Sequence, residues 1–300
     1  MARGTELESL AEELGSPLAG WSAVGWGDAQ ATSRVALADG RVVAARRIAG
    51  AAGVRDAERM AAVMARLATG GIPVPRATVI ERPGSVAWLV TPWIEGDSGA
   101  AWLDSGDRAR HLAARMGELA PRLATVDPAG LGLDTRASTD AEIAELGRRQ
   151  LQSLPVDHAT RVAVEPRLEL LAAQSDRPPV FAHGDFAPVN VVIDANGEVA
   201  AVLDLEHARL APPGADAAWW GWVVRHHHPE AWTAAWPGFL AASAIDAGRD
   251  EARLAALTLG QLLDRAATAP DVAACDRWLR LLRVTAAAHG PEADVRETHG

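Results

Sequence analysis

The chain has 300 residues and a formal net charge of −10, and it contains one cysteine, Cys275, and no lysine, so that all 29 basic residues are arginines. An acidic chain without clustered basic residues argues against a nucleic-acid partner, and a single cysteine excludes an intramolecular disulfide framework and fits a reducing cytoplasm. The absence of lysine excludes mechanisms that need a lysine amine, such as a pyridoxal Schiff base. No apolar run reaches the length of about 18 residues that a membrane span needs.

The N-terminal third predicts a small antiparallel sheet with one main helix. Apolar residues recur at helical spacing over 55–69, and Gly70-Gly71 ends this helix before Pro73-Val-Pro75 forces extended chain. A short helix is expected over 1–15. The expected strands are 21–26, 34–37, 41–48, 77–81 and 86–90.

From Gly96 onward the pattern is mostly helical. The exceptions are a short apolar run at 180–182 and a hairpin with strands 191–193 and 199–203, whose tip is Asn196-Gly197. The last ten residues, 291–300, are expected to form a flexible tail. Helices are expected around 112–123, with an interruption at Pro121, and over 139–152, 159–174, 216–236, 250–267 and 271–287.

The most informative residues follow the 180–182 run. His183-Gly-Asp185 is followed by Asn190 after five positions and by Asp204 after fourteen more. Phosphoryl transfer needs a carboxylate that takes the proton of the attacking hydroxyl, and an Asn and an Asp that hold Mg²⁺ on the nucleotide phosphates. Asp185 fits the first role, and Asn190 and Asp204 fit the second. The alternative is that Asp185 and Asn190 only cap turns, but this does not predict the spaced Asp204.

These residues resemble the aminoglycoside phosphotransferase family, whose loop reads H-G-D-x-x-x-x-N and whose metal strand reads I/L-D-[FWL]-E. Gly71–Pro75 is similar to the family's G-[IV]-P-V-P segment, and the resemblance covers about residues 20–225. It implies an α+β, protein-kinase-like fold with two lobes. The N-lobe would be an antiparallel sheet with one main helix at 1–92, the hinge 93–96, and the larger, mostly helical C-lobe 97–290.

The resemblance also assigns a nucleotide site. Gly25 and Gly27 would lie in the turn that covers the phosphates, where the lack of a side chain lets backbone N–H groups approach. In the hinge, the carbonyl of Pro92 and the amide of Ile94 would hold the adenine edge.

A cation normally clamps the phosphates in this fold. Arg46 matches the family's lysine position, although strand alternation leaves Arg47 open. The acid expected to pair with that cation is Glu58, with Asp56 as the alternative, because the family's Glu position falls on Met60 here.

Other residues of the motif are assigned supporting roles. His183 is expected to pin the loop through hydrogen bonds, Glu206 to support the metal strand or face the substrate, and Asp216 to cap the next helix and brace the loop. The family often has Leu-His where this chain has Leu123-Ala124, so a buried brace is missing.

Two further clusters allow competing interpretations. Adjacent histidines on a helix point about 100° apart, so His226–His228 is not expected to bind a metal. Five tryptophans lie within 219–236, and they either pack in the core or bind a cation of the substrate through their faces.

The sequence therefore predicts a phosphotransferase that uses Mg²⁺ to move the γ-phosphate of ATP or GTP to a hydroxyl of a small molecule. The acidity of the chain and the resemblance point to a cationic acceptor, an antibiotic of aminoglycoside or cyclic-peptide type. The alternatives are a metabolite kinase acting on choline-like, homoserine or sugar acceptors, and an inactive nucleotide-binding pseudokinase.

Overall fold

The structure is a computed structural model that describes residues 2–24, 32–174 and 177–288. The chain divides into two compact units, which are described separately. The first contains Met1–Ser98, Ala129–Gly132 and Val191–Glu206, and the second contains Gly99–Pro128, Leu133–Asn190 and His207–Gly300.

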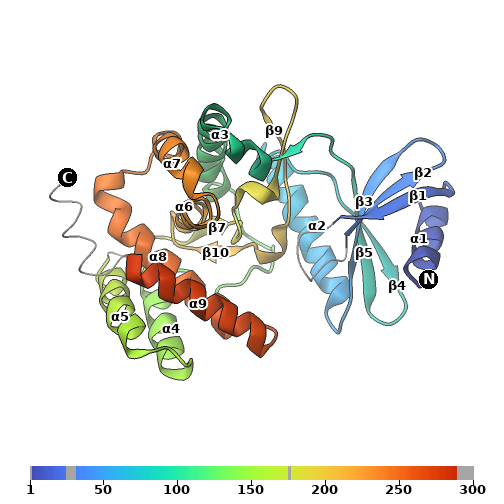
Figure 1. Cartoon of the computed structure of the whole chain (residues 1–300). Coiled ribbons are helices and arrows are strands. Elements are labelled where there is room, and N and C mark those ends of the chain that lie inside the picture. The colour runs from blue at the N-terminus through green and yellow to red at the C-terminus, as the bar shows by residue number, and fades with distance from the viewer. Residues whose placement is uncertain (1, 25–31, 175–176, 289–300) are drawn as a thin grey trace. The chain divides into compact units, whose positions relative to one another are not determined.

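The first unit is built on a five-stranded antiparallel sheet in the order β1-β2-β3-β5-β4 (Figure 1). Its strands are β1 (Leu18–Ala23), β2 (Thr32–Leu37), β3 (Val42–Ile48), β4 (Thr78–Arg82) and β5 (Val86–Pro92). Alternate residues of β2 are buried, as expected for a strand with one covered face. This confirms the predicted antiparallel N-terminal sheet.

Two helices flank this sheet on opposite sides (Figure 1). Helix α1 (Ala2–Glu13) buries Leu7 and Leu10 in a cluster with strand residues such as Val35 and Trp88. Helix α2 (Gly53–Thr69) buries an apolar stripe at helical spacing and ends at Gly70. The stripe consists of Ala57, Met60, Val63, Met64 and Leu67.

A second, three-stranded sheet also belongs to the first unit. It has the order β6-β8-β9, with β6 (Asp97–Ser98), β8 (Val191–Ile193) and β9 (Val199–Val202). The backbone N–H of Val202 donates to the carbonyl of Pro73 at 2.7 Å. These contacts attach the 191–206 hairpin to the N-terminal sheet unit, whereas the expected division placed it in the C-lobe at 97–290.

The second unit is mostly helical, as predicted. A short antiparallel pair, β7 (Val180–Ala182) with β10 (Arg209–Ala211), lies among the helices. Most of its core lies where α4, α5, α6, α8 and α9 meet. The helices are α3 (Gly106–Ala124), α4 (Asp140–Ser153), α5 (His158–Ala172), α6 (Ala215–His227), α7 (Pro229–Ser243), α8 (Ala247–Ala267) and α9 (Val272–Ala288).

Two helix boundaries differ from the expectation. The expected helix 216–236 is two helices, because α6 ends before His228 and Pro229 starts α7 at a first-turn position, where its missing N–H costs nothing. Helix α3 continues through Pro121, three residues before its end, rather than stopping there. Among the described residues, no helix is long and apolar enough to cross a membrane.

Candidate active site

The loop that follows β7 is fixed by a carboxylate from the start of α6. Asp216 accepts hydrogen bonds from the backbone N–H groups of His183 (2.8 Å) and Gly184 (2.9 Å). Burial raises the pKa of Asp216, and the nearby His183 and the two backbone donors oppose that rise. Gly184 has a φ of +78°, and a Cβ there would lie 2.1 Å from the carbonyl oxygen of His207. The loop therefore passes so close to the next segment that only glycine fits.

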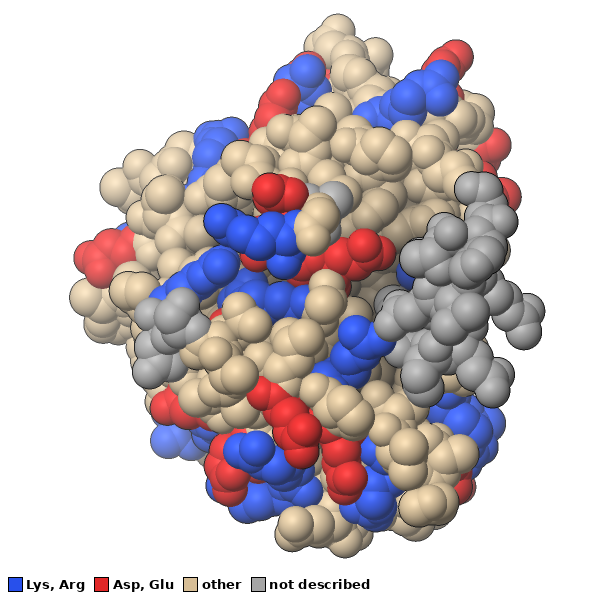
Figure 2. All heavy atoms as spheres, turned by 90° about the vertical axis from the view of Figure 1, so that its left-hand side faces the viewer, with Lys and Arg blue, Asp and Glu red and all other residues tan. Residues whose placement is uncertain are grey.

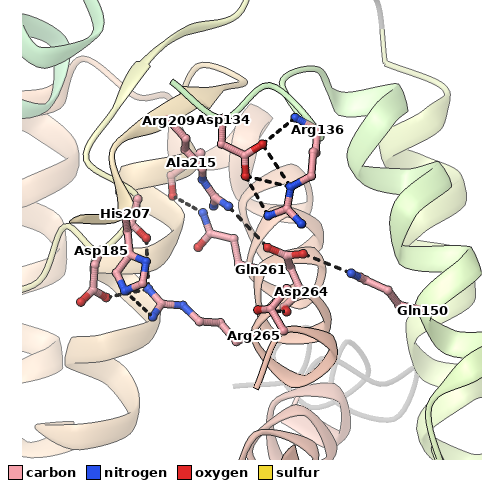
Figure 3. A network of polar contacts seen from close by, with 12 residues as sticks. Asp134, Arg136, Gln150, Asp185, His207, Arg209, Ala215, Gln261, Asp264 and Arg265 are labelled. Carbon is pink, nitrogen blue, oxygen red and sulfur yellow. Dashed lines mark hydrogen bonds and ion pairs between the residues drawn. The ribbon is translucent and has the colours of Figure 1, made fainter. Parts of the chain in front are cut away.

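Asp185 follows immediately and is held from several sides (Figure 3). Its Oδ1 accepts from the indole Nε1 of Trp219 at 2.7 Å and from Nη2 of Arg265 at 3.0 Å, and its Oδ2 accepts from Nδ2 of Asn190 at 3.2 Å. Burial alone would raise the pKa of Asp185, but the positive charges of Arg265 and His207 outweigh it and lower the pKa. This carboxylate is ionised at neutral pH and can accept a proton.

Asn190 ends the 3₁₀ turn Pro188–Asn190 and is also oriented by Asp185. Its Nδ2 donates to the backbone carbonyl of Asp185 at 2.8 Å as well as to the carboxylate. Within the described parts of the chain, the amide oxygen of Asn190 accepts no hydrogen bond from another residue. The amide is therefore turned so that its oxygen is available as a ligand.

Asp204 and Glu206 lie in the first unit, together with Arg46 of β3. The Arg46 guanidinium places Nη1 2.6 Å from Oδ1 of Asp204 and Nη2 against Oε2 of Glu206. Burial would lower the pKa of Arg46, but the two carboxylates outweigh it and raise the pKa. Asp204 has a φ of +59°, which a non-glycine residue rarely adopts. Such strain is found mainly at functional positions.

The expected partner of Arg46 on α2 lies elsewhere. The structure brings Arg46 to Asp204 and Glu206, while Glu58 is exposed and Asp56 is half-buried, and neither contacts Arg46. Arg47, the alternative cation, points to the other side of the strand and pairs with Glu6 of α1 at 3.0 Å. Strand alternation thus separates the two arginines, and Arg46 is the one beside Asp204.

The donor set limits which metal the chain can hold. Among the described residues, no group of three or more His, Cys, Asp or Glu side chains could bind a metal ion. A carboxylate (Asp204) and an amide oxygen (Asn190) are hard ligands that suit Mg²⁺, which usually takes one or two carboxylates and completes its shell with water and nucleotide phosphates. Each of these two donors, taken by itself, therefore suits Mg²⁺ that arrives with a nucleotide.

The predicted adenine-binding residues lie at the end of β5. Pro92 is the last residue of the strand and pairs with Val43. The next backbone N–H, that of Trp93, donates to the carbonyl of Val42 at 3.0 Å. The N–H of Ile94 donates to no other residue that the structure describes, so it is available to a ligand. Gly25 and Gly27 lie outside the described residues.

The tryptophans of 219–236 mainly pack against one another and against the core. Trp219 stacks on Trp222 at 4.7 Å between ring centroids, and Trp220 stacks on Phe239 at 4.2 Å. His226 stacks on Trp222 at 5.3 Å. Trp219, Trp220 and Trp222 are buried, which supports the packing interpretation for these three rings.

Sequence reasoning missed the residues that hold Asp185. Trp219 lies one turn after Asp216 on α6, and Arg265 lies near the end of α8, eighty positions after Asp185. No motif marks either residue, because only the packing of α6 and α8 brings them to the loop. Figure 3 shows the guanidinium of Arg265 next to both Asp185 and the ring of His207.

A polar network continues from this point into the helical unit (Figure 3). Asp264, next to Arg265 on α8, accepts from Nε2 of Gln150 at 3.1 Å and lies 3.8 Å from Nη1 of Arg209. Asp134 is held by a fork from Arg136, with an Nη2 distance of 2.7 Å. The network links β10, α4 and α8.

Comparisons with known proteins place the chain. Residues 20–257 match the model of the "Phosphotransferase enzyme family". The comparison with curated proteins gives no match. Among solved structures, a GDP complex of wild-type aminoglycoside 2'-phosphotransferase-IIIa is similar, with a TM-score of 0.75, 12% identity, and coverage of 95% of this chain and 98% of that chain.

Two further structures are similar over nearly the whole chain. Macrolide 2'-phosphotransferase MphH from Brachybacterium faecium has a TM-score of 0.69 and 19% identity, with 92% and 97% of the two chains covered. A complex of a thermostable mutant of aminoglycoside phosphotransferase APH(4)-Ia with ADP and hygromycin B has a TM-score of 0.70 and 17% identity, with 94% and 98% covered. At these identities the structures establish the fold, and the match over residues 20–257 establishes the family: this chain belongs to the phosphotransferase enzyme family.

Proposed function

We propose that this enzyme transfers the γ-phosphate of ATP or GTP to a hydroxyl of a small molecule, with Asp185 as the general base. The observation that carries the proposal is the state of Asp185, an ionised carboxylate oriented by Trp219, Arg265 and Asn190. Because Oδ1 takes two of these donors, Oδ2 faces only the Asn190 amide and retains a lone pair for the acceptor hydroxyl. A base within hydrogen-bond reach of the attacking hydroxyl contributes about 10²–10⁴ in rate.

Asn190 and Asp204 would hold Mg²⁺ through the amide oxygen and the carboxylate. Bound there, the metal would neutralise charge on the nucleotide phosphates. Asp204 keeps Oδ2 without a partner among the described residues, while its Oδ1 accepts from Arg46. The Asn190 amide cannot rotate without losing both bonds to Asp185, so its oxygen is oriented before any ligand binds.

Arg46 would replace the family's lysine at the phosphates. Its guanidinium has five N–H donors, and the contacts to Asp204 and Glu206 leave donors for phosphate oxygens. The free N–H of Ile94 and the carbonyl of Pro92 would bind the edge of the base, and Gly25 and Gly27 would allow backbone N–H groups to approach the phosphates. Similar structures contain GDP or ADP, which is consistent with either ATP or GTP as the donor.

For the acceptor, antibiotics are the first class to test. Similar structures include complexes with kanamycin and with hygromycin B, and macrolide 2'-phosphotransferases. A metabolite kinase acting on choline-like, homoserine or sugar acceptors is the alternative. An inactive nucleotide-binding protein is disfavoured, because such a protein has no need of an ionised carboxylate that three side chains hold in place.

The test is turnover by the wild type and by Asp185→Asn, with Asp107→Asn as the control, since Asp107 is an exposed carboxylate of α3. Acceptors would be kanamycin, hygromycin B, a macrolide, a cyclic-peptide antibiotic, choline, homoserine and a neutral sugar, each with ATP or GTP. We expect Asp185→Asn to lower kcat by about 10²–10⁴ without weakening nucleotide binding, and Asp107→Asn to change neither. Near-full activity of Asp185→Asn would contradict the assignment, and turnover confined to homoserine or a neutral sugar would exclude the antibiotic class.

A further inference from the structure

The guanidinium of Arg265 occupies a cation site beside the catalytic base (Figure 3). Its Nη2 donates to Oδ1 of Asp185 at 3.0 Å and to the carbonyl of Gly184 at 3.1 Å. Its central carbon lies 4.8 Å from the centroid of the Trp219 ring and 5.6 Å from that of Trp278. A carboxylate, a carbonyl and two aromatic faces are the groups that bind an organic cation. We call these four residues and Arg265 the Arg265 clasp.

The negative charge in the Arg265 clasp is already neutralised by the chain's own cation. The charge of Asp185 is balanced by Arg265, and the exposed His207 ring lies 3.4 Å from Nη1 of the same guanidinium. The neighbouring acid on α8, Asp264, faces Arg209 at 3.8 Å. A second cation entering beside Asp185 would therefore meet a neutralised carboxylate and a fixed positive charge, so ammonium groups are disfavoured there.

Charges of both signs are mixed on one face of the molecule. On the face shown in Figure 2, arginines and acidic residues are interspersed among the described residues, and no continuous acidic field covers it. Other tryptophan faces are also covered by the chain's own arginines. Arg225 lies over Trp232 at 5.6 Å, and Arg108 lies over Trp102 at 4.7 Å. Beside Asp185, likewise, the chain's own Arg265 takes the position that a cation of the acceptor would need.

We propose that Arg265 is a specificity-determining residue that fills the cation site beside Asp185, so that the enzyme accepts hydroxyls carried by an uncharged part of the acceptor and rejects those flanked by ammonium groups. This inference rests on the phosphotransfer function proposed above and names the chemical class of its acceptor. It narrows the expectation of a cationic acceptor, because any ammonium groups would then lie away from the reacting hydroxyl.

The first experiment measures binding of a free cation to the clasp. In Arg265→Ala the vacated space should bind ethylguanidinium, which carries the charge and shape of the lost group. We expect millimolar ethylguanidinium to raise the melting temperature of Arg265→Ala and to change its tryptophan fluorescence in a saturable way. The affinity of Arg265→Ala for ethylguanidinium should be at least about tenfold higher than that of the wild type. The control is Arg108→Ala, which removes a similar stack on Trp102 away from Asp185. If the wild type or Arg108→Ala responds as strongly, or if folded Arg265→Ala does not respond, the proposal is wrong.

The second experiment measures acceptor preference and uses Arg265→Gln. This variant keeps much of the side chain and a hydrogen-bond donor for Asp185, so it serves even if Arg265→Ala does not fold. The probes are glucose and 2-amino-2-deoxyglucose, which differ by one ammonium group. We expect the wild type to favour the neutral sugar in kcat/KM, and Arg265→Gln to shift the ratio toward the amine by about tenfold. An unchanged ratio, or a wild type that prefers the amine, overturns the proposal. The binding experiment needs no turnover, so failure of the phosphotransfer proposal, detected with Asp185→Asn, is separable from failure of this one.

Discussion

The buried ion pair between Arg253 and Asp140 offers the most direct test of the forces that hold the helical unit together. Nε and Nη2 of Arg253 each lie 2.9 Å from an oxygen of Asp140, and Nη1 donates to the carbonyl of Pro213 at 2.8 Å. The side chains are only 4% and 1% exposed. One arginine of α8 therefore connects the first residue of α4 with the segment that precedes α6.

We predict that Arg253→Met destabilises the helical unit by about 4 kcal/mol. Breaking a buried pair from one side costs about 3–5 kcal/mol, because the remaining charge stays buried without a partner. Two lost hydrogen bonds to a charged group, at about 1.5–3 kcal/mol each, give a similar figure. With a urea m-value of about 2 kcal/mol/M, the unfolding midpoint should fall by about 2 M.

The assay is urea unfolding followed by tryptophan fluorescence, since most tryptophans lie in the helical unit. The control is Arg148→Met, which breaks an exposed pair with Glu145 and should cost less than about 1 kcal/mol. The double variant Arg253→Met/Asp140→Leu should recover much of the loss, because no buried charge remains unpaired. A loss below about 1 kcal/mol for Arg253→Met, or a double variant no more stable than the single one, would refute this reasoning.

Four further predictions follow from individual contacts. Gly184→Ala should abolish turnover, measured by kinetics, and lower the stability, measured by thermal unfolding. The left-handed conformation alone costs ~1–2 kcal/mol for alanine, and the Cβ would lie 2.1 Å from the His207 carbonyl oxygen. Ala124→Leu should stabilise the fold against urea by about 1 kcal/mol, because Ala124 lines a mainly apolar pocket of about 220 Å³. Asp157 caps α5, and hydrogen bonds from Thr160 and Arg283 lower its pKa. In thermal unfolding scans, the stability lost in Asp157→Asn should therefore be largest at neutral pH and should shrink as the pH falls below about 4. Arg46→Lys should raise the nucleotide KM about tenfold in steady-state assays, because one ammonium cannot make the fork to two carboxylates.

Each of these predictions has a control or a contradicting result. Gly132→Ala has the same conformational cost at a φ of +60° but meets no atom within 4 Å, so it should keep activity. Ala141→Leu, at an exposed site of α4, should leave stability unchanged. If the difference in stability between Asp157→Asn and the wild type grows as the pH falls, the prediction is wrong. A group whose pKa is lowered in the fold stabilises the fold only while it is ionised. An activity of Arg46→Lys above that of the wild type would show that the pairing of Arg46 with Asp204 and Glu206 is not needed for nucleotide binding.

Local patterns were sufficient to predict most of the fold. Alternation in β2 and β3 and the apolar stripe of α2 specify which faces are buried, and glycines and prolines mark the ends of elements. The α6–α7 boundary is marked in the sequence by Pro229, but a proline in the first turn of a second helix is not distinguished by local pattern from one inside a single long helix. Pro121 predicts an interruption, but it lies in the last turn of α3, and most of the helix precedes it.

The site could be predicted only where the chemistry is local in sequence. Asp185 and Asn190 lie on one short loop, and their spacing alone brings the amide to the carboxylate. The partners of Arg46 could not be predicted in this way, because the Arg46–Asp204 pair joins positions 158 residues apart. The place of Glu58 on a helix face predicts it as the partner, but a helical pattern does not show which acid lies nearest to a given strand position.

The absence of lysine has a physical consequence that connects the two arginines of the candidate site. An ammonium group is a compact charge that serves one anion well, whereas a guanidinium is a planar fork that stacks on rings while it donates from its edge. Arg46 uses the fork to hold Asp204 and Glu206 together, and Arg265 uses both properties, since it donates to Asp185 while stacking on Trp219 and Trp278. Neither arrangement tolerates a lysine without losing one of its partners. The acids expected to act in catalysis are therefore positioned by cations whose shape, and not only their charge, determines the geometry.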